Sequence, residues 1–308
     1  MRYKLTIQYD GTPFKGFQRQ SYTSCTVQYE LETAISKVCN QAIQVHASGR
    51  TDVGVHALGQ VVHFDTTNIR KENDILRGCN HYLPDTVKVL RVETVDENFH
   101  ARHSAVSKTY RYFFAVENIR FSIENDGNSD LNNIKFSAEN SDDSIVKSGD
   151  SSSVGNCSSC DESGSMVVLD RNFAFGDKDV HIRDRAMFVP YLDVEKIKEA
   201  CKLLVGRHDF GSFKGANSMP YYTTERTVLD CKISTSVCPI TNVQLVCLEI
   251  KSKGFLYNMV RLIAGLLSRI GQNKASLDDL KEAIKIQNRK HTKLLAPACG
   301  LYLTSVEY

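Results

Sequence analysis

The order of hydrophobic patterns along the chain restricts its fold more than any other feature of the sequence. In the first part, alternation of apolar and polar residues predicts strands, and apolar residues at helical spacing predict helices. The predicted strands are 2–10, 43–47, 60–65 and 87–92, and the predicted helices are 27–38 and 73–83. Thr26 has the position of an N-cap residue, and Pro84 ends the second helix. The predicted order is βαββαβ.

The second part of the chain repeats this order without obvious sequence identity. The predicted strands are 108–114, 227–234, 243–252 and 301–306, and the predicted helices are 194–205 and 255–270, with an extra helix at 277–286. This is the order of the ferredoxin-like or RRM-like unit, whose open sheet often binds RNA. We therefore predict an α+β fold of two RRM-like halves, 1–107 and 108–308. They would form a mixed, mainly antiparallel sheet with helices on its outer face and a central RNA-binding cleft.

Residues 122–165 differ in composition from the rest of the chain. They are rich in Ser, Asn, Asp and Gly and poor in aromatic residues, which predicts a disordered acidic insertion within the second half. From 124 to 165, nine acidic residues and two lysines give a net charge of −7, so the remainder of this +2 chain carries +9. That surplus is compatible with a phosphate-binding face. Cys157 and Cys160 form a CxxC pair without a second pair at zinc-finger spacing, so we expect no metal site.

The composition also bears on the location of the protein. No apolar stretch approaches the roughly 18 to 20 residues of a membrane span, and the first residues lead into a strand pattern rather than a signal sequence. The ten cysteines are scattered, and Cys39, Cys201, Cys231 and Cys247 lie inside apolar patterns, which favours buried thiols over disulfides. We expect a soluble protein of the cytoplasm, with an organelle as the alternative, and no membrane partner.

Residues 49–56 read Gly-Arg-Thr-Asp-Val-Gly-Val-His and carry one carboxylate between two glycines. The glycines permit close approach of another molecule. Arg50 and Asp52 are two residues apart, and in an extended segment such residues point to the same side. An isolated Asp-x-Gly is more typical of a turn. The remaining segments of the chain decide between a turn and a catalytic carboxylate.

Taken whole, residues 49–56 resemble the catalytic segment of the TruA type of tRNA pseudouridine synthase. Five further segments resemble the same family in the same order: 9–20, 99–112, 225–227, 254–261 and 296–303. The family often has Trp where this chain has Phe17. Apart from the insertion, the resemblance covers nearly the whole chain.

The resemblance implies an enzyme that isomerises uridine to pseudouridine in the anticodon stem-loop of tRNA, at positions 38 to 40. It also implies a homodimer in which each tRNA touches both subunits. In the family, the matching aspartate attacks the target nucleoside, a second arginine approaches it, and a tyrosine lies against the target base. The corresponding residues here are Asp52, Arg226 and Tyr110.

This reaction breaks the N1–C1′ bond and joins C5 to the same sugar carbon, so no atoms or electrons enter and no cofactor is needed. An ionised carboxylate can act as nucleophile or electrostatic partner at C1′. Arg50 and Arg226 would keep Asp52 ionised by charge pairing. Tyr110 would stack on the base or take part in proton transfer, although the alternate aromatic residues on its strand alone favour core packing.

The target nucleotide must be turned out of its helix, and the flanking stem must be held meanwhile. For the stem we propose four basic residues, each of which is equally explained as a solvated surface charge: Arg19, Arg102, Lys253 and Arg261. By the resemblance, the further RNA-binding candidates are Gln18, His56, Phe255 and Leu256.

Two other functions use part of the same pattern. A non-catalytic RNA-binding protein would explain two RRM-like halves, but it gives no reason for Arg-Thr-Asp between glycines and lacks the RRM aromatic signature. A glycoside hydrolase would also use a carboxylate at C1′, but it needs a second acid, and the matched segments offer none beside Asp52.

Overall fold

The computed structural model of the protein describes residues 1–120, 182–216, 223–238, 241–286 and 289–308. The predicted insertion at 122–165, with Cys157 and Cys160, lies outside the described residues.

The first half contains β1 (Arg2–Tyr9), α1 (Val27–Cys39), β2 (His46–Ala47), β3 (His56–Asp65), α2 (Glu72–Tyr82) and β4 (Val87–Val95). Thr26 is the N-cap of α1, as predicted, and its side chain accepts a hydrogen bond from the Tyr29 N–H. β2 has only two residues, shorter than predicted. β3 begins at His56 rather than Gln60, so this strand starts directly after the Asp52 loop.

The second half contains β5 (Ser107–Arg120), β6 (Met187–Asp193), α3 (Val194–Leu204), β7 (Gly206–Asp209), β8 (Glu225–Val237), β9 (Gln244–Ser252), α4 (Met259–Gly271), α5 (Leu277–Lys285) and β10 (Leu301–Glu307). Two short 3₁₀ helices, η1 (Gly211–Phe213) and η2 (Ala298–Gly300), complete it. β6 and β7 were not predicted. α4 begins at Met259 rather than Phe255, because Asn258 before it has a left-handed φ of 61°.

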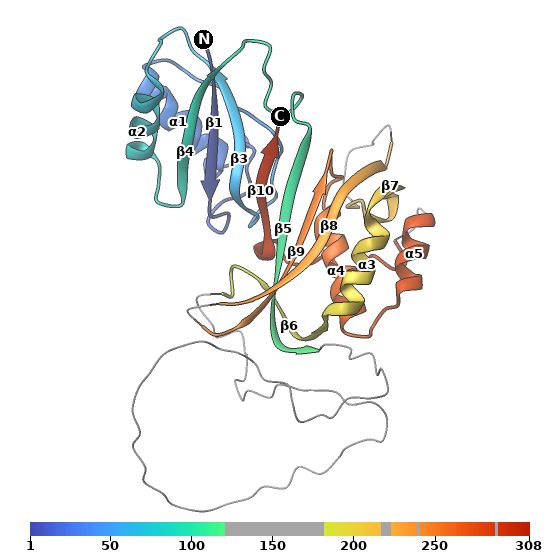
Figure 1. Cartoon of the computed structure of the whole chain (residues 1–308). Helices are drawn as coiled ribbons and strands as arrows, with labels where there is room; N and C mark the ends of the chain where they lie inside the picture. Colours follow the sequence, from blue (N-terminus) through green and yellow to red (C-terminus); the bar gives the residue numbers. More distant parts are fainter. Residues whose placement is uncertain (121–181, 217–222, 239–240, 287–288) are drawn as a thin grey trace, which may run out of the picture.

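One sheet runs through both halves in the order β4-β1-β3-β10-β5-β9-β8-β7, with β2 on β3 and β6 on β5 (Figure 1). Among the described strands only the β10–β3 and β5–β6 pairs are parallel. The predicted mixed, mainly antiparallel α+β fold is therefore confirmed, whereas the RRM-like nature of each half stays a prediction. β10 joins the halves, and its parallel ladder to β3 consists of Tyr302 opposite His56 and Leu303 opposite Ala57.

The helices form two groups, each with its own core (Figure 1). α1 and α2 pack on β1, β3 and β4, while α3, α4 and α5 pack on the strands of the second half. Leu301 and Leu303 are two residues apart in β10, so they point to one face, and each enters a different core. Both helix groups therefore cover the same face of the sheet. Tyr110 packs against both cores and so lies at their border.

The described cysteines are free thiols, and the four that the sequence placed in apolar patterns are buried, as predicted. None of the described helices is long and apolar enough to cross a membrane.

Candidate active site

Asp52 lies in the loop between β2 and β3, and its side chain is 32% exposed. The loop turns tightly after it: the Val55 N–H donates to the Asp52 carbonyl at 3.1 Å, and Gly54 has a φ of +75°, which favours glycine. On the other side, the Phe17 N–H donates to the Thr51 carbonyl at 3.1 Å. The turn begins at Asp52 and follows the Arg50–Asp52 segment, so the common side expected of Arg50 and Asp52 stays a prediction.

Arg261, in the first turn of α4, is the ion-pair partner that the structure gives Asp52. Its Nη1 lies 4.0 Å from Asp52 Oδ2, and its side chain is 14% exposed. The guanidinium is held in place because Nε donates to the Ala296 carbonyl at 2.8 Å and Nη1 to Asn258 Oδ1 at 3.3 Å. Burial raises the pKa of the Asp52 carboxyl above its usual value, and Arg261 opposes that rise. The result is a partly desolvated carboxylate beside a fixed cation.

The structure does not bring the two predicted arginines into this pair. Arg50 is exposed and makes no side-chain hydrogen bond or ion pair within the described part of the chain. Arg226 Nη1 donates to the carbonyls of Thr223 and Glu225 at 3.0 and 2.6 Å. Their contact with Asp52 therefore stays a prediction, and Arg261, which the sequence assigned to the RNA stem, has the position expected of them.

Two tyrosines border the Asp52 loop. Tyr110 meets the ring of Phe255 edge-on, with centroids 5.0 Å apart. Burial is the main cause that raises the pKa of Tyr110, and Tyr9 and Asp52 add to it, so the phenol remains protonated beside the carboxylate. The hydroxyl of Tyr9 lies 2.7 Å from Thr51 Oγ1, and burial raises the pKa of Tyr9 to about 12. Sequence reasoning placed Tyr9 in a strand but missed its contact with this loop.

The other basic candidates lie at the surface, where RNA can reach them. Arg102 and Lys253 are exposed. Arg19 is 56% exposed, pairs with Glu32 at 3.0 Å and lies over the ring of Tyr29. Gln18 is half-buried next to it, and both line a polar hollow of about 430 Å³.

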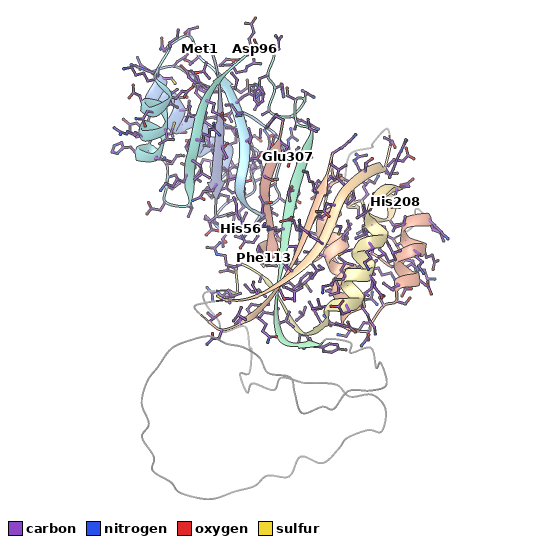
Figure 2. The ribbon with its side chains drawn as sticks, in the orientation of Figure 1. Met1, His56, Asp96, Phe113, His208 and Glu307 are labelled. Atoms are coloured by element: carbon purple, nitrogen blue, oxygen red, sulfur yellow. The ribbon has the colours of Figure 1, made fainter. Side chains whose placement is uncertain are left out.

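Two of the residues predicted to contact RNA have buried side chains. His56 is 1% exposed and Leu256 is 3% exposed, so neither side chain is available at the surface. Leu256 belongs to the core of the second half. His56 is enclosed because β3 begins at this residue and pairs with β10, whose Tyr302 stacks on the imidazole with centroids 4.5 Å apart. Figure 2 shows His56 where the strands of the two halves meet.

Lys108 forms a hydrogen bond with the segment that leads into the Asp52 loop, a contact that the sequence did not suggest. Its Nζ donates to the Ser48 carbonyl. Ser48 Oγ and Gln60 share a hydrogen bond, and Gln60 Nε2 donates to the Gly49 carbonyl at 2.7 Å. Burial, with a smaller effect of Arg102, lowers the pKa of Lys108 to about 8. The segment before Asp52 is therefore held by the poorly solvated Lys108 ammonium group.

Replacing Lys108 by Met is expected to change how stability depends on pH. The folded pKa of about 8 lies below the ordinary 10.5, so the unfolded parent binds more protons between these values and the parent gains stability as pH rises through this window. The variant lacks this gain, which is on the order of 1–3 kcal/mol. Urea unfolding at pH 7 and pH 10 measures it. Parallel pH dependence in both proteins would contradict the burial of a charged Lys108.

Fold and site together place one partly buried carboxylate, with a fixed arginine beside it, at the border of the two helix groups. No group of three or more His, Cys, Asp or Glu side chains in the described ranges is placed to hold a metal ion. A sequence model of the family described as tRNA pseudouridine synthase matches residues 5–104 and 200–308. The chain belongs to this family, and it is an isomerase.

Several curated relatives match over nearly their whole length. The chain is 35% identical to tRNA pseudouridine synthase A of Bacillus pumilus, with 100% of this chain and 99% of the relative covered. It is 34% identical to the proteins of the same name from Shewanella woodyi, with 100% and 93% covered, and Methylacidiphilum infernorum, with 99% and 95% covered. The resemblance predicted from the sequence is thereby confirmed.

Proposed function

We propose that this protein isomerises uridine to pseudouridine in the anticodon stem-loop of tRNA, at positions 38 to 40. The observation that carries the proposal is the partly buried Asp52 carboxylate, which faces Arg261 and lies beside Tyr110 at the border between the halves. The names of the relatives support tRNA as the substrate. The choice of the anticodon arm, the homodimer and the cytoplasmic location rest on the family resemblance.

The site residues suit each step of this isomerisation. The Asp52 carboxylate attacks or electrostatically stabilises C1′ while the N1–C1′ bond breaks and its electrons stay on the uracil. The freed base turns so that C5 bonds to C1′, after which C5 loses its proton and N1 gains one. Arg261 fixes the carboxylate, and the neutral ring of Tyr110 provides a stacking surface for the base.

Release of tritium from C5 of labelled uridine in tRNA tests the reaction. Substrates in which U38, U39 and U40 are replaced one at a time test the position. Absence of release from every substrate would contradict the reaction and leave a non-catalytic RNA-binding protein as the better description. Undiminished release from a tRNA that lacks all three uridines would contradict the position only.

Binding of tRNA is expected to weaken steeply with salt. Exposed cations such as Arg19, Arg102 and Lys253 would displace counterions from phosphates, and each displaced ion adds to the salt dependence. Filter binding between 50 and 200 mM salt should show a loss of affinity of about tenfold or more. The same assay on a DNA oligonucleotide of equal length serves as control. A flat response to salt would contradict a phosphate-binding face.

A further inference from the structure

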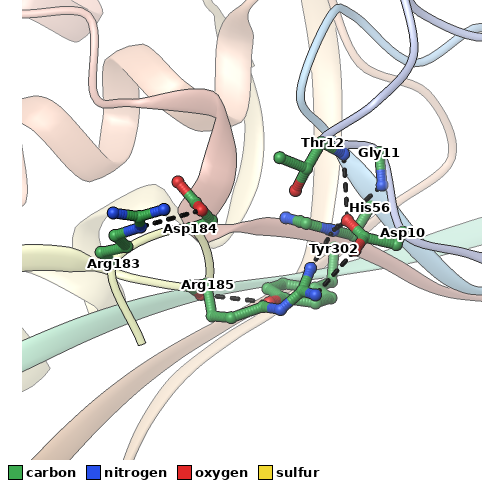
Figure 3. A network of polar contacts seen from close by, with 8 residues as sticks. All are labelled: Asp10, Gly11, Thr12, His56, Arg183, Asp184, Arg185 and Tyr302. Atoms are coloured by element: carbon green, nitrogen blue, oxygen red, sulfur yellow. Dashed lines mark hydrogen bonds and ion pairs between the residues drawn. The ribbon is translucent and has the colours of Figure 1, made fainter. Parts of the chain in front are cut away.

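A second group of polar side chains lies on the face of the sheet opposite to Tyr110 and is not used by the reaction as described. It comprises Asp10, His56, Arg185 and Tyr302 (Figure 3). His56 and Tyr302 alternate with Ala57 and Leu303, which enter the core on the helix-covered face. We propose that Arg185 is a positioning residue: by bridging Asp10 and His56, it fixes the end of the loop that carries Asp52. This inference rests on the proposed function.

Arg185 makes two contacts with its guanidinium. Nη2 lies 2.7 Å from Asp10 Oδ2, and Nη1 lies 3.3 Å from His56 Nδ1. Asp10 Oδ1 lies 3.2 Å from the same Nδ1. The Tyr302 hydroxyl donates to the backbone carbonyl of Arg185 at 3.1 Å, which ties the segment before β6 to β10. The group therefore connects residues from the first half of the chain with residues from the second.

The protonation state of His56 follows from its hydrogen bonds. The Gly11 N–H donates to His56 Nδ1 at 3.1 Å, so this nitrogen is an acceptor and the imidazole is neutral. Burial lowers the pKa of His56, which favours the same state. A neutral Nδ1 lone pair and the Asp10 carboxylate repel each other at this distance. The cation of Arg185 offsets that repulsion, because it faces both groups.

His56 is coupled to Asp52 through a short stretch of constrained backbone. The turn from Asp52 to Val55 leads directly into His56. Gly11 packs so closely on this turn that a Cβ there would overlap the Val55 carbonyl oxygen. The start of the same loop is held by the Tyr9 hydroxyl at Thr51 Oγ1. A displaced His56 ring would therefore shift the backbone on which Asp52 lies.

The charges around His56 predict how the enzyme without Arg185 responds to pH. Five residues from four segments face the ring: Asp10, Asp184, Arg185, Cys299 and Tyr302. Arg185 lowers the pKa of His56 and Asp10 raises it. Without Arg185, burial still lowers the pKa of His56, but one of the two effects that oppose Asp10 is lost, so His56 takes up a proton at a higher pH than in the parent. A protonated Nδ1 would donate to Asp10 and lose the hydrogen bond from Gly11.

Arg185→Gln should lower the single-turnover rate at saturating tRNA by about tenfold or more at pH 6, with a smaller loss at pH 8.5. The dissociation constant for tRNA should change by less than about threefold. Asp10→Asn keeps the acceptor for the Thr12 N–H at 3.0 Å but removes the charge. It too should slow the saturated rate, and the double variant should be no slower than the slower single variant. Arg185→Lys should restore part of the rate at pH 6.

Arg183→Gln is the matched control, because Arg183 is exposed and its ion pair is with Asp184 at 3.3 Å. It should leave rate, affinity and melting temperature as in the parent. Arg185 is itself 42% exposed, so a direct contact with RNA phosphate is the competing role. A tenfold weaker affinity of Arg185→Gln at an unchanged saturated rate would overturn the inference in favour of that contact.

Equal rates of Arg185→Gln and the parent at pH 6 would also overturn the inference. Equal losses at pH 6 and pH 8.5 would do the same, because they would show a structural effect without the titration of His56. Failure of the proposed function looks different: the parent itself would then release no tritium. In that case NMR titration of the imidazoles still tests the bridge, since His56 should be protonated at a higher pH in Arg185→Gln than in the parent.

Discussion

Replacing Asp52 by Asn is expected to abolish pseudouridine formation while the fold and tRNA binding persist. The amide has the size of the carboxylate, but it is a poor nucleophile and offsets no positive charge at C1′. It also leaves Arg261 without its anionic partner in a half-buried site. In single-turnover assays the rate should fall by several orders of magnitude. Affinity for tRNA should change by less than about tenfold, or under ~1.4 kcal/mol.

The pH dependence of the parent provides an independent check on Asp52. Burial raises the pKa of this carboxyl above 3.8, so the reactive carboxylate is lost as pH falls through a value higher than that of an ordinary aspartate. The single-turnover rate should decline on this acidic limb while the protein stays folded by circular dichroism. Pseudouridine formation by Asp52→Asn at near the parent rate would contradict the proposed catalytic role of Asp52.

Replacing Arg261 by Gln is expected to have the second largest effect, a loss of about 10²–10³ in the saturated rate. The charge that opposes the raised pKa of Asp52 is then missing, so the acidic limb of the pH profile should move to higher pH. A cation in the first turn of α4 is unfavourable for the helix dipole, which indicates that Arg261 is placed for the site rather than for the helix.

Arg269→Gln is the matched control for this experiment. Arg269 lies in the last turn of the same helix, is half-buried, and donates to the Lys274 carbonyl at 3.2 Å. It should change the rate by less than about threefold. Parallel measurements on Arg50→Gln and Arg226→Gln decide whether Asp52 pairs with Arg261, as in the structure, or with Arg50 and Arg226, as the sequence predicts. A larger loss in either of these than in Arg261→Gln would favour the pairing predicted from the sequence.

Local patterns in the sequence predicted most of the fold. The alternation of Tyr3, Leu5, Ile7 and Tyr9 predicted β1, and Thr26 predicted the start of α1, because both depend on neighbouring residues only. β7 has four residues with none of them buried, and β6 contains Pro190 and no regular alternation, so neither has a readable signal. β7 forms because it pairs with β8, and β6 forms because it pairs with β5.

The candidate site shows the same limit, because local patterns do not record contacts between distant segments. The motif around Asp52 predicts the catalytic carboxylate, but the arginine that pairs with it in the structure depends on how α4 approaches the loop, which no local spacing records. His56 was named as an RNA contact by the family resemblance, which does not show how far the side chain is buried. Its burial depends on Tyr302 in β10, far away in the sequence. The contact of Tyr9 with Thr51 likewise joins two separate segments.

The central place of β10 in the sheet has a consequence for the synthesis of the protein. A growing chain contains Asp52, Tyr110 and Arg261 before it contains Leu301–Glu307. Until that strand is made, β3 and β5 have no strand between them, and His56 has no Tyr302 to stack on. We therefore expect activity to arise in a single step, only after β10 has been made. A ribosome-bound chain that stops before β10 would hold Asp52, Tyr110 and Arg261 without the arrangement that the proposed reaction requires.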